Sequence, residues 1–240
     1  MEKKTHSVVK DPSIPVQYLA DYMAASAQAR RSIVQKSKYK SLARTFQHQI
    51  ARKTISDHLT DGNPLPGDLA SKADDVRNKL ADEDFYKQLY GYNADFIEAF
   101  AGVGGMFNFA SFELMAPQNI GTPEYNGTRV KFTPSLLTYR MTKVNTQKIG
   151  ASIFRYAKGS FVAIEVAEWQ AAFMYGYFSE NPFIEEAKPE NKLCQVLCAV
   201  AGATFVAPSN STYKFNEMKA VCSDIAEKWA NVQPPAGAVI

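Results

Sequence analysis

The chain has 240 residues, of which 46% are hydrophobic and 21% are charged, and its formal net charge is +3. This balance excludes a disordered chain, a collagen-like repeat and a coiled-coil rod, and it is typical of a folded globular protein. The length allows one large domain or two small ones.

The sequence carries no targeting or membrane signal that we recognise. The lysines near the N-terminus are not followed by an apolar segment, so we expect no secretory signal peptide. The longest apolar stretches, near 161–172 and 193–207, are interrupted by polar or charged residues and are too short for a membrane helix. Three cysteines are too few for a disulfide scaffold. We therefore expect a cytoplasmic protein with reduced thiols and no membrane partner.

Apolar residues recur at helical spacing in the first ninety residues. A first helix is predicted to begin at Pro15, where the missing N–H costs nothing, and its apolar face includes Val16, Leu19 and Met23. The polar run 35–40 is expected to interrupt the pattern. A second helix then carries the apolar residues Leu42, Phe46, Ile50, Ile55 and Leu59. A third helix is predicted over 69–90, with the apolar positions Leu69, Val76, Leu80, Phe85 and Leu89.

The apolar pattern changes after Val130 from a helical period to an alternating one. Leu137, Tyr139 and Met141 alternate with polar residues, and a second alternating run follows at 149–154. Two such runs around a short polar turn predict a β-hairpin. Helices are predicted over 162–177 and 215–229, and 193–206 is either a buried helix or a buried strand.

These elements predict a helix-rich α+β protein with an antiparallel β-hairpin packed by helices. We expect a basic helical unit at 1–90 and an α+β unit at 91–240, with the hairpin near 130–158, or one continuous domain. Strands and helices do not alternate along the chain, which argues against a doubly wound parallel sheet.

The small net charge conceals two basic segments. Residues 1–55 contain eleven Lys or Arg and three acids, a net charge of +8, and residues 125–164 contain seven Lys or Arg and no acid, a net charge of +7. The rest of the chain therefore carries −12. Segregated positive charge of this kind favours binding to a phosphate backbone.

Aromatic residues are interspersed with the basic residues of the hairpin, and such a surface could stack bases while Lys and Arg hold the strand. These aromatic residues are Phe132, Tyr139, Phe154, Tyr156 and Phe161. His48 and His58 lie on the basic N-terminal helix and could contact phosphate or face solvent. The candidate nucleic-acid-binding residues are Arg30, Arg31, Lys36, Lys38, Lys40, Arg44, Arg52, Lys53, Arg140, Lys143, Lys148, Arg155, Tyr156 and Lys158.

The leading hypothesis is a non-enzymatic protein or accessory subunit that binds nucleic acid, either DNA or RNA. The basic residues could instead pair with acids of the same chain, for which the stretch 57–98, with a net charge of −6, is the expected partner. They could also pair with a protein partner in a larger assembly, or bind an anionic small molecule. A further alternative is a carboxylate-dependent nuclease that uses Glu165 and Glu168, which stand at i and i+3 on one helix face.

Two other motifs contain residue types that can carry chemistry. The run 100–105 (Phe-Ala-Gly-Val-Gly-Gly) resembles the loop that approaches S-adenosylmethionine in the cytosine-C5 DNA methyltransferases. The Pro-Cys and Glu-Asn-Val motifs of that family are absent, so we predict a packing loop between helices and no cofactor. Cys194 and Cys198 would share a helix face, and with Cys222 they are predicted to be buried apolar thiols and not metal ligands. We expect no catalytic constellation and no metal site.

Overall fold

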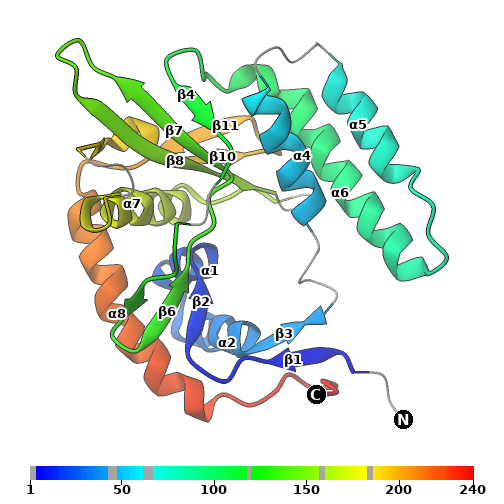
Figure 1. Cartoon of the computed structure of the whole chain (residues 1–240). Helices are drawn as coiled ribbons and strands as arrows, with labels where there is room; N and C mark the ends of the chain where they lie inside the picture. Colours follow the sequence, from blue (N-terminus) through cyan, green and yellow to red (C-terminus); the bar gives the residue numbers. More distant parts are fainter. Residues whose placement is uncertain (1–3, 43–47, 62–66, 118–119, 157–159, 183–185) are drawn as a thin grey trace.

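A computed structural model describes residues 4–42, 48–61, 67–117, 120–156, 160–182 and 186–240 (Figure 1). The helices of this part of the chain are α1 (Val16–Met23), α2 (Ala27–Lys38), α4 (Gln49–Thr60), α5 (Asp68–Arg77), α6 (Asp84–Val103), α7 (Ile164–Glu180) and α8 (Ser211–Asn231), with 3-10 turns at Gly104–Met106 and Asn191–Leu193. The strands are β1 (His6–Val8), β2 (Ser13–Pro15), β3 (Tyr39–Ser41), β4 (Glu113–Met115), β5 (Glu124–Tyr125), β6 (Thr128–Lys131), β7 (Leu136–Met141), β8 (Gln147–Arg155), β9 (Lys188–Pro189), β10 (Gln195–Cys198) and β11 (Ala203–Val206). The chain has a helix-rich α+β fold.

The largest sheet has the strand order β11-β10-β8-β7-β4, and β9 also pairs with β8. β7 and β8 form an antiparallel hairpin in which Leu136 pairs with Ser152 and Met141 with Gln147. β8 and β10 are parallel, and helix α7 makes the connection between them. Smaller sheets are formed by β2-β6-β5 and by β1-β3.

Both faces of the central sheet are apolar, because neighbouring residues of a strand point to opposite faces and both are buried. Leu137 of β7 and Ile153 of β8 belong to one hydrophobic core, which includes helices α1, α7 and α8. Leu136 and Phe154 belong to a second core, which includes α4, α5 and α6. The sheet therefore lies between two groups of helices (Figure 1).

The N-terminal segment packs against the C-terminal half of the chain. Helix α1 contacts α7, and α2 contacts α8. At the chain ends, the backbone N–H groups of Thr5 and His6 donate to the carbonyl of Val239 at 3.0 and 3.1 Å, which places the two termini side by side (Figure 1). Residues far apart in the sequence thus share the first core.

Several predicted elements are confirmed. The first helix occurs at Val16–Met23, with Pro15 as its N-cap residue. The hairpin is β7–β8, closed by a hydrogen bond of 3.0 Å from the N–H of Thr142 to the carbonyl of Thr146. The helices predicted over 162–177 and 215–229 are α7 and α8. The segment 193–206 forms strands β10 and β11 and not a helix.

Other expectations need correction. The polar run at 35–40 does not prevent a helix, since α2 extends to Lys38. The described part of the predicted second helix is α4, which covers only Gln49–Thr60. The predicted helix over 69–90 is two helices, and Leu80, an expected apolar contact, lies between them with 99% of its surface exposed. The predicted loop at 100–105 is instead the end of α6 and a 3-10 turn.

The proposed unit boundary at residue 90 stays a prediction. The first unit is not purely helical, because it contains β1, β2 and β3. Its helices also contribute to two different cores: α1 and α2 to the first, α4 and α5 to the second.

Helices α7 and α8 approach closely at a glycine. A Cβ atom placed on Gly176 of α7 would lie 2.1 Å from Cγ of Phe215 on α8. Phe215 is 2% exposed and its ring makes an edge contact with Phe173, at a centroid distance of 5.5 Å. The packing of α7 on α8 therefore depends on a glycine at position 176, because any side chain there would overlap the Phe215 ring.

Substitution of Gly176 by Ala is expected to lower the free energy of unfolding by about 1–3 kcal/mol, because overpacking displaces the Phe215 ring. The measurement is denaturant unfolding followed by circular dichroism. Gly91→Ala is the matched control: Gly91 also lies within a helix, but its added Cβ would meet nothing within 4 Å. The control should be neutral or stabilising by up to about 1 kcal/mol. Equal stability of the two variants would contradict this account of the α7–α8 contact.

Candidate functional site

Two of the predicted phosphate-binding residues cap helix ends. Arg30 donates from Nε to the carbonyl of Tyr22 at 3.1 Å and from Nη2 to the carbonyl of Met23 at 3.4 Å, at the C-terminus of α1. Lys38 donates from Nζ to the carbonyl of Trp229 at 2.7 Å, at the C-terminus of α8. The last carbonyls of a helix lack partners within the helix and carry partial negative charge, so cations bind there. Arg30 and Lys38 are therefore structural.

Three other candidates form ion pairs within the chain. Arg140 makes a bidentate contact with Glu190, with N–O distances of 2.7 and 2.6 Å. Nη2 of Arg155 lies 2.7 Å from a carboxylate oxygen of Asp21, and Lys53 lies 2.5 Å from Asp57.

The acidic stretch 57–98 is not the main partner of the basic segments in the described part of the chain. Of the pairs just given, only Lys53–Asp57 uses it. Several of its own cations are paired locally, as Arg77 is with Asp95 and Glu98. Internal pairing therefore accounts for part of the basic charge, with Asp11, Asp21, Asp57 and Glu190 among its partners.

Of the five aromatic residues predicted for stacking, Phe161 is 70% exposed and the other four are buried or partly buried, so they do not form one exposed stacking surface. Phe132 and Tyr139 are 3% exposed and Phe154 is fully buried, because helices cover both faces of the sheet. Tyr156 stacks on Phe96 with a centroid distance of 4.6 Å and an interplanar angle of 9°. One face of the Tyr156 ring is thereby occupied by the protein itself.

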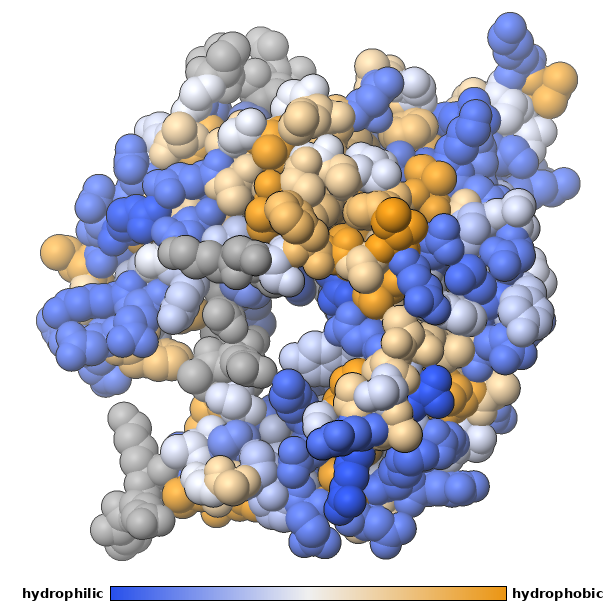
Figure 2. Space-filling model, turned by 180° about the vertical axis from the view of Figure 1, so that it is seen from behind, coloured by the Kyte–Doolittle hydropathy of each residue, from blue (hydrophilic) through white to orange (hydrophobic). Residues whose placement is uncertain are grey.

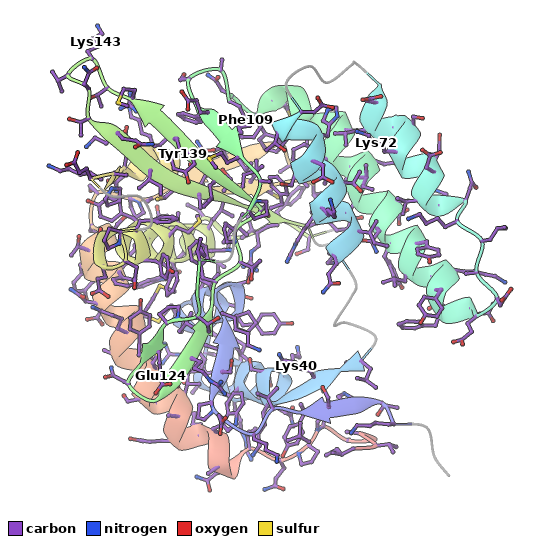
Figure 3. All side chains as sticks on the ribbon, viewed as in Figure 1. Lys40, Lys72, Phe109, Glu124, Tyr139 and Lys143 are labelled. Carbon is purple, nitrogen blue, oxygen red and sulfur yellow. The ribbon has the colours of Figure 1, made fainter. Side chains whose placement is uncertain are left out.

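Arg44 and Lys158 lie outside the described residues. The remaining candidates form no ion pair with a carboxylate in the part of the chain that the structure describes; they are Arg31, Lys36, Lys40, Arg52, Lys143 and Lys148. They do not form one surface: Lys143 lies at the tip of the β7–β8 hairpin, on the opposite side of the molecule from Lys40 (Figure 3).

The two basic segments meet at two like-charge contacts. The first joins Lys40 of β3 and Lys131 at the end of β6. The pKa of Lys40 is lowered to about 8, first by burial of the amine and then by its hydrogen bond with Lys131 and the charge of that residue. In the second, the charge of Arg155, at the end of β8, acts on Arg52 of α4. Burial lowers the pKa of Arg52, and the charge of Arg155 adds to the effect.

A pocket of about 600 Å³ lies beside α4 and is lined in part by Arg52. His48, Arg52 and Ser56 line it at i, i+4 and i+8, which places them along one side of the helix. Thr133 and Ser135, from the segment between β6 and β7, line it from the opposite wall. Of these residues, Arg52 is a predicted nucleic-acid-binding residue, and His48 is predicted either to contact phosphate or to face solvent. It did not indicate the hydroxyl residues, because they join the site only through the fold.

Polar groups of this pocket lack partners. Among the described residues, Nδ1 of His48, Nε of Arg52 and Oγ of Ser56 are shielded from solvent and make no hydrogen bond. His48 packs edge-on against Phe96 and Tyr156, at centroid distances of 5.5 and 5.7 Å. Burial, and then the charge of Arg52, lower the pKa of His48 to about 4, so the imidazole is neutral at pH 7.

The first turn of α4 is positioned by a buried side chain of α6. Asn93 is fully buried; its Oδ1 accepts from the N–H of Ala51 at 2.9 Å and its Nδ2 donates to the carbonyl of Leu89 at 2.7 Å. Ala51 and Ile55 pack into the second core on the other side of α4. The pocket residues are thus held by a rigid helix.

The other sequence predictions concern the cysteines, the carboxylates and metal binding. Cys194, Cys198 and Cys222 are buried, as predicted, and burial raises the pKa of Cys194 and of Cys222 to about 12. Cys194 and Cys198 do not share a helix face, because Cys198 lies in β10. Glu168 pairs with Lys214 at 3.4 Å. No group of three or more His, Cys, Asp or Glu side chains is placed to hold a metal ion in the described ranges.

Comparison with known proteins finds no family model that matches the chain and no significant match among curated proteins. No helix of the described residues is long and apolar enough to span a bilayer. The function must therefore be argued from the site.

The first prediction from the site concerns the cost of burying Arg52. Substitution of Arg52 by Met is expected to raise the free energy of unfolding by about 1–3 kcal/mol in a buffer without multivalent anions, because the variant removes a buried donor that has no partner. Chemical denaturation is the measurement. The matched control is Lys53→Met, which removes the same charge from the next residue, whose side chain is 77% exposed, and should change stability by less than about 0.5 kcal/mol. Destabilisation by Arg52→Met would show that the guanidinium is structurally satisfied.

A second prediction concerns pH. The pKa of His48 is about 4 in the folded protein and 6.5 in its ordinary state, so the unfolded chain takes up a proton that the folded chain excludes. The contribution of His48 to the free energy of unfolding is therefore constant above about pH 6.5. Below that pH, protonation of His48 in the unfolded chain lowers the free energy of unfolding as the pH falls toward 4. The stability of the His48→Gln variant, measured from pH 7 to 4, should decrease less steeply than that of the wild type. Parallel curves would contradict the buried, neutral state of His48.

Proposed function

We propose that the protein is a non-enzymatic nucleic-acid-binding protein or accessory subunit. The observation that carries this proposal is the meeting of the two basic segments at Lys40–Lys131 and at Arg52–Arg155. Like charges in contact destabilise the fold, and an anion bound between them would reverse that effect. The sequence separates the two segments by about seventy residues or more, whereas the fold brings them together twice.

The two contacts are joined by a short stretch of chain. Lys131 and Thr133 are both exposed and lie two residues apart, which is about 7 Å in an extended segment. Thr133 lines the α4 pocket. Lys36 and Lys40 line a second pocket, which has a volume of about 460 Å³. Cationic and hydroxyl groups therefore continue from one contact toward the other, as binding of a phosphate polymer requires.

The structure limits which residues can take this role. Arg30, Lys38 and Arg140 are committed to contacts within the chain. Lys36, Lys40, Lys131 and Arg52 are the residues that we assign to the interface. Seen from behind, the molecule is hollowed near its middle, and hydrophilic residues lie along part of the edge of this hollow (Figure 2).

A cytoplasmic location is part of the proposal, and it is supported by the buried cysteines, none of which forms a disulfide in the described residues. The alternative is a subunit that binds a protein partner. It is favoured by a hydrophobic area on the back of the molecule (Figure 2), since large exposed apolar areas often mark interfaces.

The test is binding of mixed-sequence DNA and RNA, single- and double-stranded, over a salt series by fluorescence anisotropy. Log K is expected to fall linearly with log salt. The double substitution Lys40→Ala with Lys131→Ala should reduce the slope by about 2, one for each lost phosphate contact. No detectable binding at about 50 mM salt would overturn the proposal.

The matched control is Lys72→Ala with Lys87→Ala. It changes the net charge by the same amount, but Lys72 lies on α5, away from Lys40 (Figure 3), and both lysines pair with neighbouring aspartates on exposed helix surface. This variant should keep the wild-type slope. Equal reductions in the two double variants would show that binding follows net charge only, and would overturn the assignment of the interface.

A further inference from the structure

We infer that the pocket beside α4 binds one phosphoryl group, carried as a phosphate monoester. The inference goes beyond the proposed function, because it concerns a single anionic group in a defined pocket and not a polymer along a surface. It is carried by the unpartnered donors of the pocket, by its charge and by its shape.

The donors lie on two walls. Arg52 and Ser56 extend from α4, and Ser56 is 2% exposed although its Oγ has no partner in the described residues. A guanidinium forms paired hydrogen bonds with phosphate oxygens, and the neutral His48 can add one N–H donor. Ser135 uses its Oγ to accept from the N–H of Phe154 at 3.0 Å, which leaves its hydroxyl proton for a ligand.

The charge of the pocket favours an anion. Its acidic lining residue in the described chain is Asp57, which is half-exposed and paired with Lys53 at 2.5 Å. The charge that acts on Arg52 is that of Arg155, whose own carboxylate partner is Asp21. His48 is the N-cap residue of a helix of 12 residues and Arg52 lies in its first turn, where the helix dipole is positive.

The shape indicates more than an inorganic ion. A volume of about 600 Å³ lies within the range of small-molecule sites, which is about 300–1,000 Å³. Ala116, Pro117 and Pro134 form an apolar part of the wall. A ligand with a phosphoryl group at Arg52 and an organic body against these residues would use both parts. A mononucleotide and the phosphorylated end of a nucleic-acid strand share this chemistry.

The experiment measures binding by isothermal titration calorimetry and thermal shift at constant ionic strength. The probes are inorganic phosphate, a nucleoside 5′-monophosphate and the same nucleoside without phosphate. The wild type should be stabilised by the two phosphate-containing probes and not by the nucleoside alone. Arg52→Gln should weaken monophosphate binding at least about tenfold, because the variant loses one hydrogen bond to a charged group. Lys72→Gln, which removes the same charge from α5 and not from the pocket lining, should change it less than about twofold.

Oligonucleotides with a 5′-phosphate or a 5′-hydroxyl distinguish the two possible ligands, which are a mononucleotide and the phosphorylated end of a strand. If the phosphorylated strand binds more tightly and this difference is lost in Arg52→Gln, the inference is supported and the ligand is the end of a strand. Equal binding of both strands, with monophosphate binding retained, supports it and assigns a free small molecule. No stabilisation by any phosphate-containing probe, or equal affinities of Arg52→Gln and the wild type, would overturn it. Failure of the proposed function is a different result, because it is the absence of DNA and RNA binding at about 50 mM salt, whether or not a monophosphate binds.

Discussion

The fold depends on a central sheet that must be covered on both faces. β7, β8 and β10 carry buried apolar side chains at neighbouring positions, such as Leu136 and Leu137, so water has to be excluded from both sides. Helices α1, α7 and α8 cover one face and α4, α5 and α6 cover the other. This requirement places α4 at the sheet, next to the ends of β6 and β8, and so creates the pocket that contains Arg52.

Within this arrangement the basic residues divide into two groups. Arg30 and Lys38 bind the terminal carbonyls of α1 and α8, and Arg140 and Arg155 bind carboxylates. Such contacts offset the cost of desolvating a cation and hold segments together that are distant in the sequence. Arg52 has no such partner in the described residues, and burial, followed by the charge of Arg155, lowers its pKa. A buried donor without a partner lowers stability, and binding sites often retain such groups because a ligand satisfies them.

Local patterns predicted some elements well and others poorly. The alternation in 137–141 identified the hairpin, since a period of two is independent of what the strand packs against. The periodicity of 69–90 merged α5 and α6, because Leu80 fits a helical repeat although it is exposed between them. The aromatic residues of the hairpin could not be assigned to core or surface from spacing: Phe154 is buried only because α6 covers a face that an isolated hairpin would expose to solvent.

The sequence by itself determined the helix-rich α+β class, the hairpin, the burial of the cysteines and the segregation of positive charge. These properties follow from composition and from side-chain periodicity along short segments. Only the tertiary structure decided which cations are paired and which face a pocket. Arg30, Arg52 and Arg140 are the same residue type in basic segments. They differ because Arg30 meets backbone carbonyls, Arg52 lines a pocket and Arg140 meets a carboxylate, each placed there by the fold. The energy of a charge depends on its neighbours in space and on its burial, and neither is encoded in local sequence spacing.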